Sequence, residues 1–474
     1  MRLRDSFWSK LARTTLNPAV IGRSQETLVA AMKAAERIPG LHQHYRTQIR
    51  QLRGLYEANH PATELTLKLM RRHPNVRRAI IENLIINATW QGRKIREEFA
   101  SRHGVVPPYL MVISPTMRCN LNCAGCYAGE YRKTPGSERD PLSFDDLDRL
   151  VSEGKEMGIF FFTISGGEPF VRRDLLKLYA KHRDAFFLIY TNGTAIQNQD
   201  IELMQELGNF TPAISIEGDK AMTDWRRGPG VYDRVKETMA RLNEADLLFG
   251  FSATAMRSNA EYFLRDDFVD EMIRRGCLYG WFFLFVPVGQ DNTVDLMVTP
   301  EQRDRLRYFN TIYLRRHKPI FVADFWNDGH LTGGCMSGGE LYLHVNFRGD
   351  LEPCVFIHFA THNIGDIWAN GGHLWDVLSS PFFKEIRRFN RRDPNKLRPC
   401  MIIDHNEWLE HCVQACGAKP THPGADEIIK TPLCQGVRAW AAAYAPLADQ
   451  ALVNNGDYYR NFEADVSPVS GSIR

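Results

Sequence analysis

Three cysteines stand close together in the spacing C-x3-C-x2-C, at Cys119, Cys123 and Cys126. They directly follow the apolar run 109–113, which predicts a buried strand with the triplet on the loop that leaves it. Three thiolates at this spacing can bind one metal centre, but a closed zinc site takes four ligands. They suit a [4Fe–4S] cluster with one iron left open for a small molecule. The remaining alternatives are structural cysteines and a zinc ion with a distant fourth ligand.

Length and composition predict a soluble protein of two or three domains. The chain has 474 residues, of which 44% are hydrophobic and 24% charged, as is ordinary for globular proteins. It has no uncharged apolar run of about 18 residues, and its first residues lack the apolar core of a signal peptide. We therefore expect a cytoplasmic protein, in which the ten cysteines indicate metal or redox chemistry rather than disulfides.

Residues 1–105 predict a basic, helical region. They contain 19 Lys and Arg against 8 Asp and Glu, a net charge of +11 that leaves −8 for the remainder. A helix over residues 2–13 places its apolar side chains opposite its basic ones, a pattern typical of peripheral contact with an anionic membrane. The alternatives are a helical cap with a solvated surface and, without any recognition motif, contact with nucleic acid, which we do not expect. Further helices are predicted over 25–37, 42–58, 64–72 and 75–103.

Residues 106–322 predict an α/β domain, because short apolar runs alternate with helical segments. Such alternation indicates parallel strands joined by right-handed helical crossovers. The predicted strands are 109–113, 160–164, 186–190, 212–216, 248–253 and 281–286. The predicted helices begin near Ser143, Arg173, Gln199, Val231, Tyr262 and Pro300.

Polar and glycine residues follow these strands, at the edge where parallel barrels carry their sites. Gly166 and Gly167 allow a backbone to approach a ligand closely, and Glu168 can accept hydrogen bonds from an ammonium group. The third strand runs into a turn at Asn192. After the fourth strand, alternation places Ser215 and Glu217 on the same side. An arginine pair follows at Arg226 and Arg227.

These motifs, in this order, resemble those of the radical S-adenosylmethionine (radical SAM) superfamily. The resemblance implies a partial (β/α)6 TIM-like barrel whose three cysteines bind a [4Fe–4S] cluster, with S-adenosylmethionine (SAM) on the open iron. It implies that SAM is cleaved reductively to a 5′-deoxyadenosyl radical, which abstracts hydrogen from an unactivated carbon. An electron donor such as flavodoxin or ferredoxin is then a partner.

The resemblance also implies roles for single residues in SAM binding. The turn of Gly166, Gly167 and Glu168 would hold the amino group. The arginine at 227 would bind the carboxylate. The turn at Asn192 and the Ser215–Glu217 position would complete the site, the latter at the ribose. The family commonly has an aromatic residue before its third cysteine, where this chain has Gly125, and Tyr127 follows the triplet instead.

The segment 323–440 holds six further cysteines and resembles the SPASM/twitch extension of such enzymes, whose cysteines bind one or two auxiliary iron–sulfur clusters. By that comparison Cys335, Cys354 and Cys416 would share one cluster, and Cys400, Cys412 and Cys434 another, with Asp404 and His405 as further ligand candidates. A single four-cysteine cluster and a structural zinc site are the alternatives. We expect Cys277 to be a buried structural thiol, and His358, His362 and His422 to be surface or hydrogen-bonded residues.

The substrate is the least constrained prediction. The basic start favours a membrane lipid or isoprenoid, and the SPASM-like region favours a peptide or protein as the alternative. A non-catalytic iron–sulfur carrier or sensor is the alternative from another class, but it needs no glycine turns or arginine after the strands. The expected divisions are a helical region at 1–105, a barrel at 106–322, an auxiliary domain at 323–440 and a disordered polar tail at 441–474.

Overall fold

The computed structural model describes residues 24–37, 43–134, 136–430, 432–456 and 458–459. Its centre is one nine-stranded sheet in the order β7-β6-β5-β4-β3-β2-β1-β8-β9. All neighbours pair in parallel except β8 and β9, which are antiparallel. The helix predicted over residues 2–13 lies outside the described residues.

The six predicted strands are all present. They are β1 (Leu110–Ile113), β2 (Phe161–Ile164), β3 (Phe186–Thr191), β4 (Phe210–Ser215), β5 (Gly250–Ala255) and β6 (Tyr279–Leu284). The sheet continues beyond them on both sides, through β7 (Phe321–Asp324) next to β6 and β8 (Tyr342–Val345) next to β1. Strand β7 crosses the boundary predicted at residue 322. The sequence did not predict this strand, because it is short and carries a buried aspartate, Asp324.

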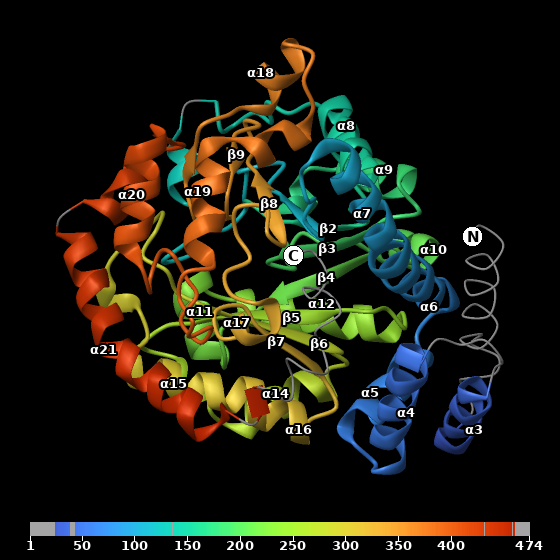
Figure 1. The fold of residues 1–474 in the computed structure, drawn as a ribbon. Helices are drawn as coiled ribbons and strands as arrows, with labels where there is room; N and C mark the ends of the chain where they lie inside the picture. Colours follow the sequence, from blue (N-terminus) through green and yellow to red (C-terminus); the bar gives the residue numbers. More distant parts are fainter. Residues whose placement is uncertain (1–23, 38–42, 135, 431, 457, 460–474) are drawn as a thin grey trace.

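Helices pack around the sheet and cover its outward face (Figure 1). The connecting helices are α8 (Phe144–Glu156), α9 (Leu175–Lys181), α10 (Asn198–Leu207), α12 (Val231–Glu244), α13 (Ala260–Phe263), α14 (Asp266–Arg274) and α15 (Pro300–Tyr308). Helix α8 shows why they form: Ser143 caps its amino end in a capping box with Asp146, and Leu147, Leu150 and Val151 face the sheet. A short helix that the sequence did not predict, α11 (Lys220–Arg227), follows β4.

The amino-terminal helices lie at the end of the sheet opposite the cysteine loop. They are α3 (Gln25–Glu36), α4 (Gln43–Glu57), α5 (Pro61–Met70) and a continuous rod of α6 (Pro74–Ala79), π-helical η1 (Ile80–Gln91) and α7 (Gly92–His103). The side chain of Asn83 donates to the carbonyls of Arg183 and Ala185, just before β3. Arg72 donates to the carbonyl of Gly276, just before β6. These contacts join the helices to the amino ends of the strands. A helical cap was one of the alternatives predicted for this region.

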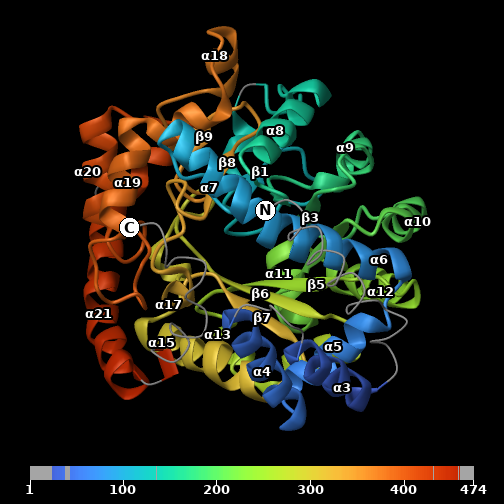
Figure 2. The same cartoon turned by 45° about the vertical axis from the view of Figure 1, so that its right-hand side comes forward.

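The cysteine-rich segment packs on one side of the sheet. It contains the β8–β9 hairpin (β9 is Leu351–Glu352), the pair β10 (Phe359–Ala360) and β11 (Lys419–Pro420), and three helices on the orange and red side of Figures 1 and 2. These helices are α19 (Pro381–Asn390), α20 (Asn406–Cys416) and α21 (Leu433–Asn454).

The disordered tail predicted from residue 441 is wrong over its first part, because α21 runs to Asn454. Its buried side chains recur at helical spacing: Val437, Trp440, Tyr444, Ala448 and Ala451. The indole of Trp440 donates to the carbonyl of Val298 over 2.7 Å, which fastens α21 beside α15. Alanines dominate this helix, and small side chains hide the amphipathic pattern that larger residues would reveal.

Candidate functional site

The three cysteines lie on the loop after β1, at the carboxyl edge of the sheet. Two neighbouring segments hold this loop from different sides. The amide of Ala124 donates to the carbonyl of Arg226 over 2.8 Å, and the amide of Gly125 donates to Oδ2 of Asp291 over 3.0 Å. The loop is therefore fixed by α11, which follows β4, and by the turn that follows β6.

The chemistry of the triplet fits a metal cluster. All three thiols are free and half-buried. Burial raises the pKa of Cys119 to about 11, and it raises the pKa of Cys126 as well. Buried thiols of this kind become thiolates when a metal cation replaces the proton. Among the described residues, no three His, Cys, Asp or Glu side chains converge as ligands of a single metal ion.

Gly166 and Gly167 are required by the close approach of the turn to the cysteine loop. A Cβ on Gly166 would lie 2.5 Å from the carbonyl oxygen of Thr116, and Gly166 has a φ of 101°. A Cβ on Gly167 would lie 2.3 Å from the carbonyl oxygen of Arg118. Since any side chain would push the two segments apart, the paired glycines bring the turn after β2 against the loop that carries Cys119.

Glu168 has a fully buried carboxylate that other protein groups already bind. Its Oε2 accepts from the amide of Asn192 over 2.7 Å, and its Oε1 accepts from Thr191 Oγ1 over 2.8 Å and from the amide of Phe170 over 3.0 Å. Burial raises its pKa. The carboxylate therefore joins the turn after β2 to the turn after β3. Its predicted contact with an ammonium group stays a prediction.

Glu217 lies between two arginines in a buried cluster with a net positive charge. Arg226 Nη1 lies 2.6 Å from Glu217 Oε1, and Arg227 Nε lies 2.8 Å from the same oxygen. Desolvation opposes the charge of Glu217, but the two guanidinium groups hold its pKa below the usual value. Arg227 Nη1 also lies 3.9 Å from the Sγ of Cys123. One carboxylate cannot neutralise two arginines, so this cluster presents positive charge to the thiols.

The other predicted cofactor residues border the same loop. Asn192 Nδ2 lies 3.9 Å from the Sγ of Cys119. The hydroxyl of Tyr127 lies 2.6 Å from Ser165 Oγ and accepts from the amide of Gly166 over 3.0 Å. Ser215 lies farther down the inner face, with its Oγ 3.2 Å from that of Ser252. The structure thus gathers these residues at one edge, and their roles toward SAM stay predictions.

Gly125 stands before the third cysteine, where an aromatic residue was expected. The ring of another residue fills the space beside it. A Cβ on Gly125 would lie 2.6 Å from the ring of Phe285, which follows β6, and Gly125 has a φ of 63°. Glycine is thus required both by its backbone and by the neighbouring ring. Sequence reading missed Phe285 and Asp291 as site residues: Phe285 lies within the predicted strand 281–286, and Asp291 follows that strand by five residues.

Comparison with known proteins identifies the domain that carries this site. Residues 113–260 match the family model of the radical SAM superfamily. That span begins at the last residue of β1 and includes the cysteine loop, both glycines, Glu217 and both arginines. The chain is a radical SAM enzyme. Its cofactors are accordingly a [4Fe–4S] cluster and SAM, with auxiliary iron–sulfur clusters in the cysteine-rich region.

The relatives of this radical SAM enzyme fall into two groups. An AdoMet-dependent heme synthase of Methanosarcina barkeri is 24% identical over 361 residues, covering 69% of this chain and 96% of its own. The mycofactocin maturase MftC of Mycolicibacterium smegmatis is 24% identical over 370 residues, covering 74% and 87%. Among solved structures, Streptococcus suis SuiB bound to its precursor peptide SuiA has a TM-score of 0.52 at 19% identity, covering 70% and 84%. This last likeness confirms the fold.

Among the auxiliary cysteines, Cys335 neighbours both Cys354 and Cys400. Burial, followed by the nearby Cys335 thiol, raises the pKa of Cys354 to about 12, and Cys335 also lies close enough to Cys400 to contribute to its raised pKa. Cys416 instead neighbours Cys412 on α20. The turn after residue 399 brings Cys400 near Cys335. The sharing of one cluster by Cys335, Cys354 and Cys416, and of another by Cys400, Cys412 and Cys434, stays a prediction. Cys434 lies in the first turn of α21.

Asp404 and His405, the further ligand candidates, both bind other protein groups. Both oxygens of Asp404 pair with the buried Arg303, and Oδ2 accepts from the amide of Cys400 over 2.9 Å. His405 Nε2 lies 2.8 Å from an oxygen of Asp393, and its ring stacks on Trp408. Asp404 thus positions the turn that carries Cys400.

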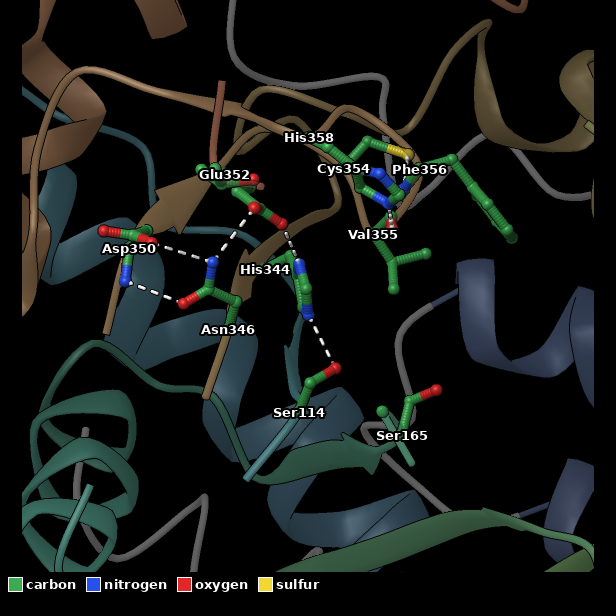
Figure 3. A network of polar contacts seen from close by, with 12 residues as sticks. Ser114, Ser165, His344, Asn346, Asp350, Glu352, Cys354, Val355, Phe356 and His358 are labelled. Carbon is green, nitrogen blue, oxygen red and sulfur yellow. Dashed lines mark hydrogen bonds and ion pairs between the residues drawn. The ribbon is translucent and has the colours of Figure 1, made fainter. Parts of the chain in front are cut away.

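A buried polar network joins the barrel to the auxiliary hairpin (Figure 3). His344, on β8, lies 2.6 Å from Glu352 Oε2 through Nδ1 and 2.7 Å from Ser114 Oγ through Nε2. Tyr131 donates to the other oxygen of Glu352 over 2.6 Å. Sequence reading missed this network, since its members are far apart in the chain and only their strand register brings them together.

The three histidines expected to be surface or hydrogen-bonded residues do form hydrogen bonds. His358 and His422 are buried and lie 2.8 Å apart through Nδ1 and Nε2. His362 Nδ1 lies 2.8 Å from Thr361 Oγ1. Cys277 is buried, as expected.

Proposed function

We propose that this radical SAM enzyme modifies a peptide or a small protein. The observation that carries the proposal is the extent of the match to MftC, a maturase, which covers 74% of this chain and 87% of that protein and so extends well beyond residues 113–260. SuiB, which shares the fold, has been solved with a precursor peptide. No described feature supports the lipid that we expected first, and no described helix is long and apolar enough to span a membrane.

Cys119, Cys123 and Cys126 would hold the cluster, which when bound supplies the electron that cleaves SAM. Arg227, beside Cys123, would attract a carboxylate to this edge, because the Glu217 cluster keeps an excess of positive charge there. The carbonyls of the glycine turn would accept hydrogen bonds from the amino group. The auxiliary hairpin closes over Tyr127 through the ring of Phe356, whose centroid lies 5.3 Å away, and so limits access of water to this side.

The direct test is anaerobic turnover of the reconstituted enzyme with SAM, dithionite and synthetic peptides encoded by short open reading frames beside its gene. We expect 5′-deoxyadenosine together with a mass change in one peptide. A parallel incubation replaces the peptides with vesicles of extracted membrane lipid. A mass change in a lipid, with every peptide unchanged, would contradict the proposal.

A further inference from the structure

The inner face of the sheet is open to solvent near the carboxyl ends of its strands. On β6, Trp281 and Phe283 are half-buried, whereas their neighbours Phe282 and Leu284 are buried against the outer helices. Strand β3 shows the same alternation, with Tyr190 half-buried between two buried residues, and so does β5 with Thr254. Since alternate residues of a strand point to opposite faces, the half-buried set lies on the inner face, below the cysteine loop.

One side of this inner face is a continuous aromatic wall. The centroid of the Phe283 ring lies 5.4 Å from that of Tyr190, 6.3 Å from that of Trp281 and 5.6 Å from that of Phe325. Phe325 lies 6.1 Å from Phe356, which in turn contacts Tyr127. The wall therefore runs from the middle of β6 to the tyrosine that follows the third cysteine.

The strands next to the aromatic wall carry hydroxyl groups. In the sheet register Ser252 lies beside Trp281 and Thr254 beside Phe283, on the neighbouring strand. Ser215 lies next to Ser252, one strand farther. Small polar side chains that can donate and accept single hydrogen bonds therefore lie directly beside the aromatic wall, on the neighbouring strands.

The strands themselves carry no charged side chain on this inner face among the described residues. The residues of strands β1 to β7 that alternate onto the same face as Trp281 and Phe283 include Val112, Thr163, Leu188, Tyr190, Ala213, Ser215, Ser252, Thr254 and Ala323, and none of these described residues is Asp, Glu, Lys or Arg. The nearest charges follow β4: Glu217, whose Oε2 accepts from the amide of Thr254 over 3.0 Å, and the two arginines that bind it, with Arg227 also beside Cys123. A charged side chain placed lower, at the level of Trp281, would lose its hydration without an ionic partner on these strands.

We infer that the substrate residue that enters this face has an uncharged aromatic side chain, and that Phe283 and Trp281 determine this specificity. The inference rests on the proposed function, because it takes the substrate to be a peptide. Rings pair favourably in edge-to-face or offset arrangements at the centroid distances seen along the wall. The hydroxyl groups of Ser252 and Thr254 can receive a polar substituent of the ring.

The test measures binding rather than turnover. The reconstituted protein is titrated with N-acetyl-phenylalaninamide, N-acetyl-tyrosinamide, N-acetyl-lysinamide and N-acetyl-aspartamide, and bound probe is detected by saturation-transfer NMR. We expect both aromatic probes to bind at least about tenfold more tightly than the charged ones. Equal binding of charged and aromatic probes would overturn the inference.

Two substitutions on one strand provide a matched pair. Phe283→Leu should weaken binding of the aromatic probes about tenfold, whereas Phe282→Leu, which faces α14, should leave it unchanged. Equal effects of the two would also overturn the inference. The probes need no recognition sequence, so the two proposals can fail separately. If the probes show no such specificity but a peptide is still turned over, the inference alone is refuted. If no peptide is turned over at all, the proposed function is refuted.

Discussion

The SAM site and the auxiliary cysteine group are built in different ways. The SAM site takes short segments from the ends of successive strands, so its residues appear in the sequence in the order in which they surround the loop. The auxiliary group takes Cys335 from one loop, Cys354 from the end of a hairpin and Cys400 from a turn before α20. Sequence order therefore predicts neighbours in the first region, whereas in the second it leaves the grouping of the cysteines open.

The largest expected effect concerns the SAM site itself. Cys123→Ala should remove one of the three thiolates and reduce SAM cleavage to background, because a cluster of this type is held by cysteine sulfur. The measurement is 5′-deoxyadenosine formation under anaerobic conditions. Cys277→Ala is the matched control: it removes a thiol that is buried between α14 and β6, and activity should persist. Product formation by the Cys123 variant would place the cluster elsewhere.

The next prediction separates the two possible auxiliary groupings. Cys335→Ala, Cys354→Ala and Cys400→Ala should each lower the iron content of reconstituted protein by about four atoms per chain, the content of one [4Fe–4S] cluster. Cys412→Ala and Cys416→Ala should retain that iron if the group seen here holds the cluster. Iron analysis and Mössbauer spectra decide the matter. Loss of the same iron from the Cys416 variant but not from the Cys400 variant would restore the grouping predicted from sequence.

Removing the charge of Glu217 should destabilise the barrel. Glu217→Gln leaves two buried guanidinium groups without a carboxylate, and breaking such a pair costs about 3–5 kcal/mol. The depressed pKa of Glu217 also means that its contribution is present at neutral pH and is lost as the pH falls below about 4, the ordinary range for glutamate, through the folded-state value. Denaturant unfolding between pH 7 and about pH 3 should show a smaller loss of stability on acidification in the variant than in the wild type. Parallel pH profiles would contradict the prediction.

The smallest expected effect concerns Tyr342, which donates to the Sγ of Cys354 over 2.8 Å. Tyr342→Phe removes this hydrogen bond but keeps the ring, so we expect a loss of about 1 kcal/mol in stability with iron content unchanged. A negative shift in the reduction potential of the auxiliary cluster should accompany it, since hydrogen bonds to sulfur stabilise the reduced state. An unchanged potential would show that Cys354 is not a ligand of that cluster.

Most of the barrel could be predicted from sequence because each strand is a compact apolar run followed by a polar or glycine turn. Gly166 and Gly167 were recognised by type and spacing, and the close approach of Thr116 and Arg118 explains why no other residue fits. Strand β7 was missed because Asp324 interrupts its pattern.

The contacts that the sequence did not reveal depend on pairing between distant strands. His344 reaches Ser114 only because β8 pairs with β1 in parallel, 230 residues apart in sequence. Phe285 takes the place beside Gly125 only because β6 ends near the cysteine loop. Residues of this kind have no local motif, and three-dimensional pairing alone brings them into the site.

The most direct test of the whole account is electron paramagnetic resonance of the anaerobically reconstituted, dithionite-reduced protein before and after addition of SAM. The account predicts a reduced [4Fe–4S] signal that changes when SAM binds the open iron, and that is missing from the Cys123→Ala variant while the auxiliary signal remains. A wild-type signal that does not respond to SAM, or a site that retains zinc in place of iron, would contradict it.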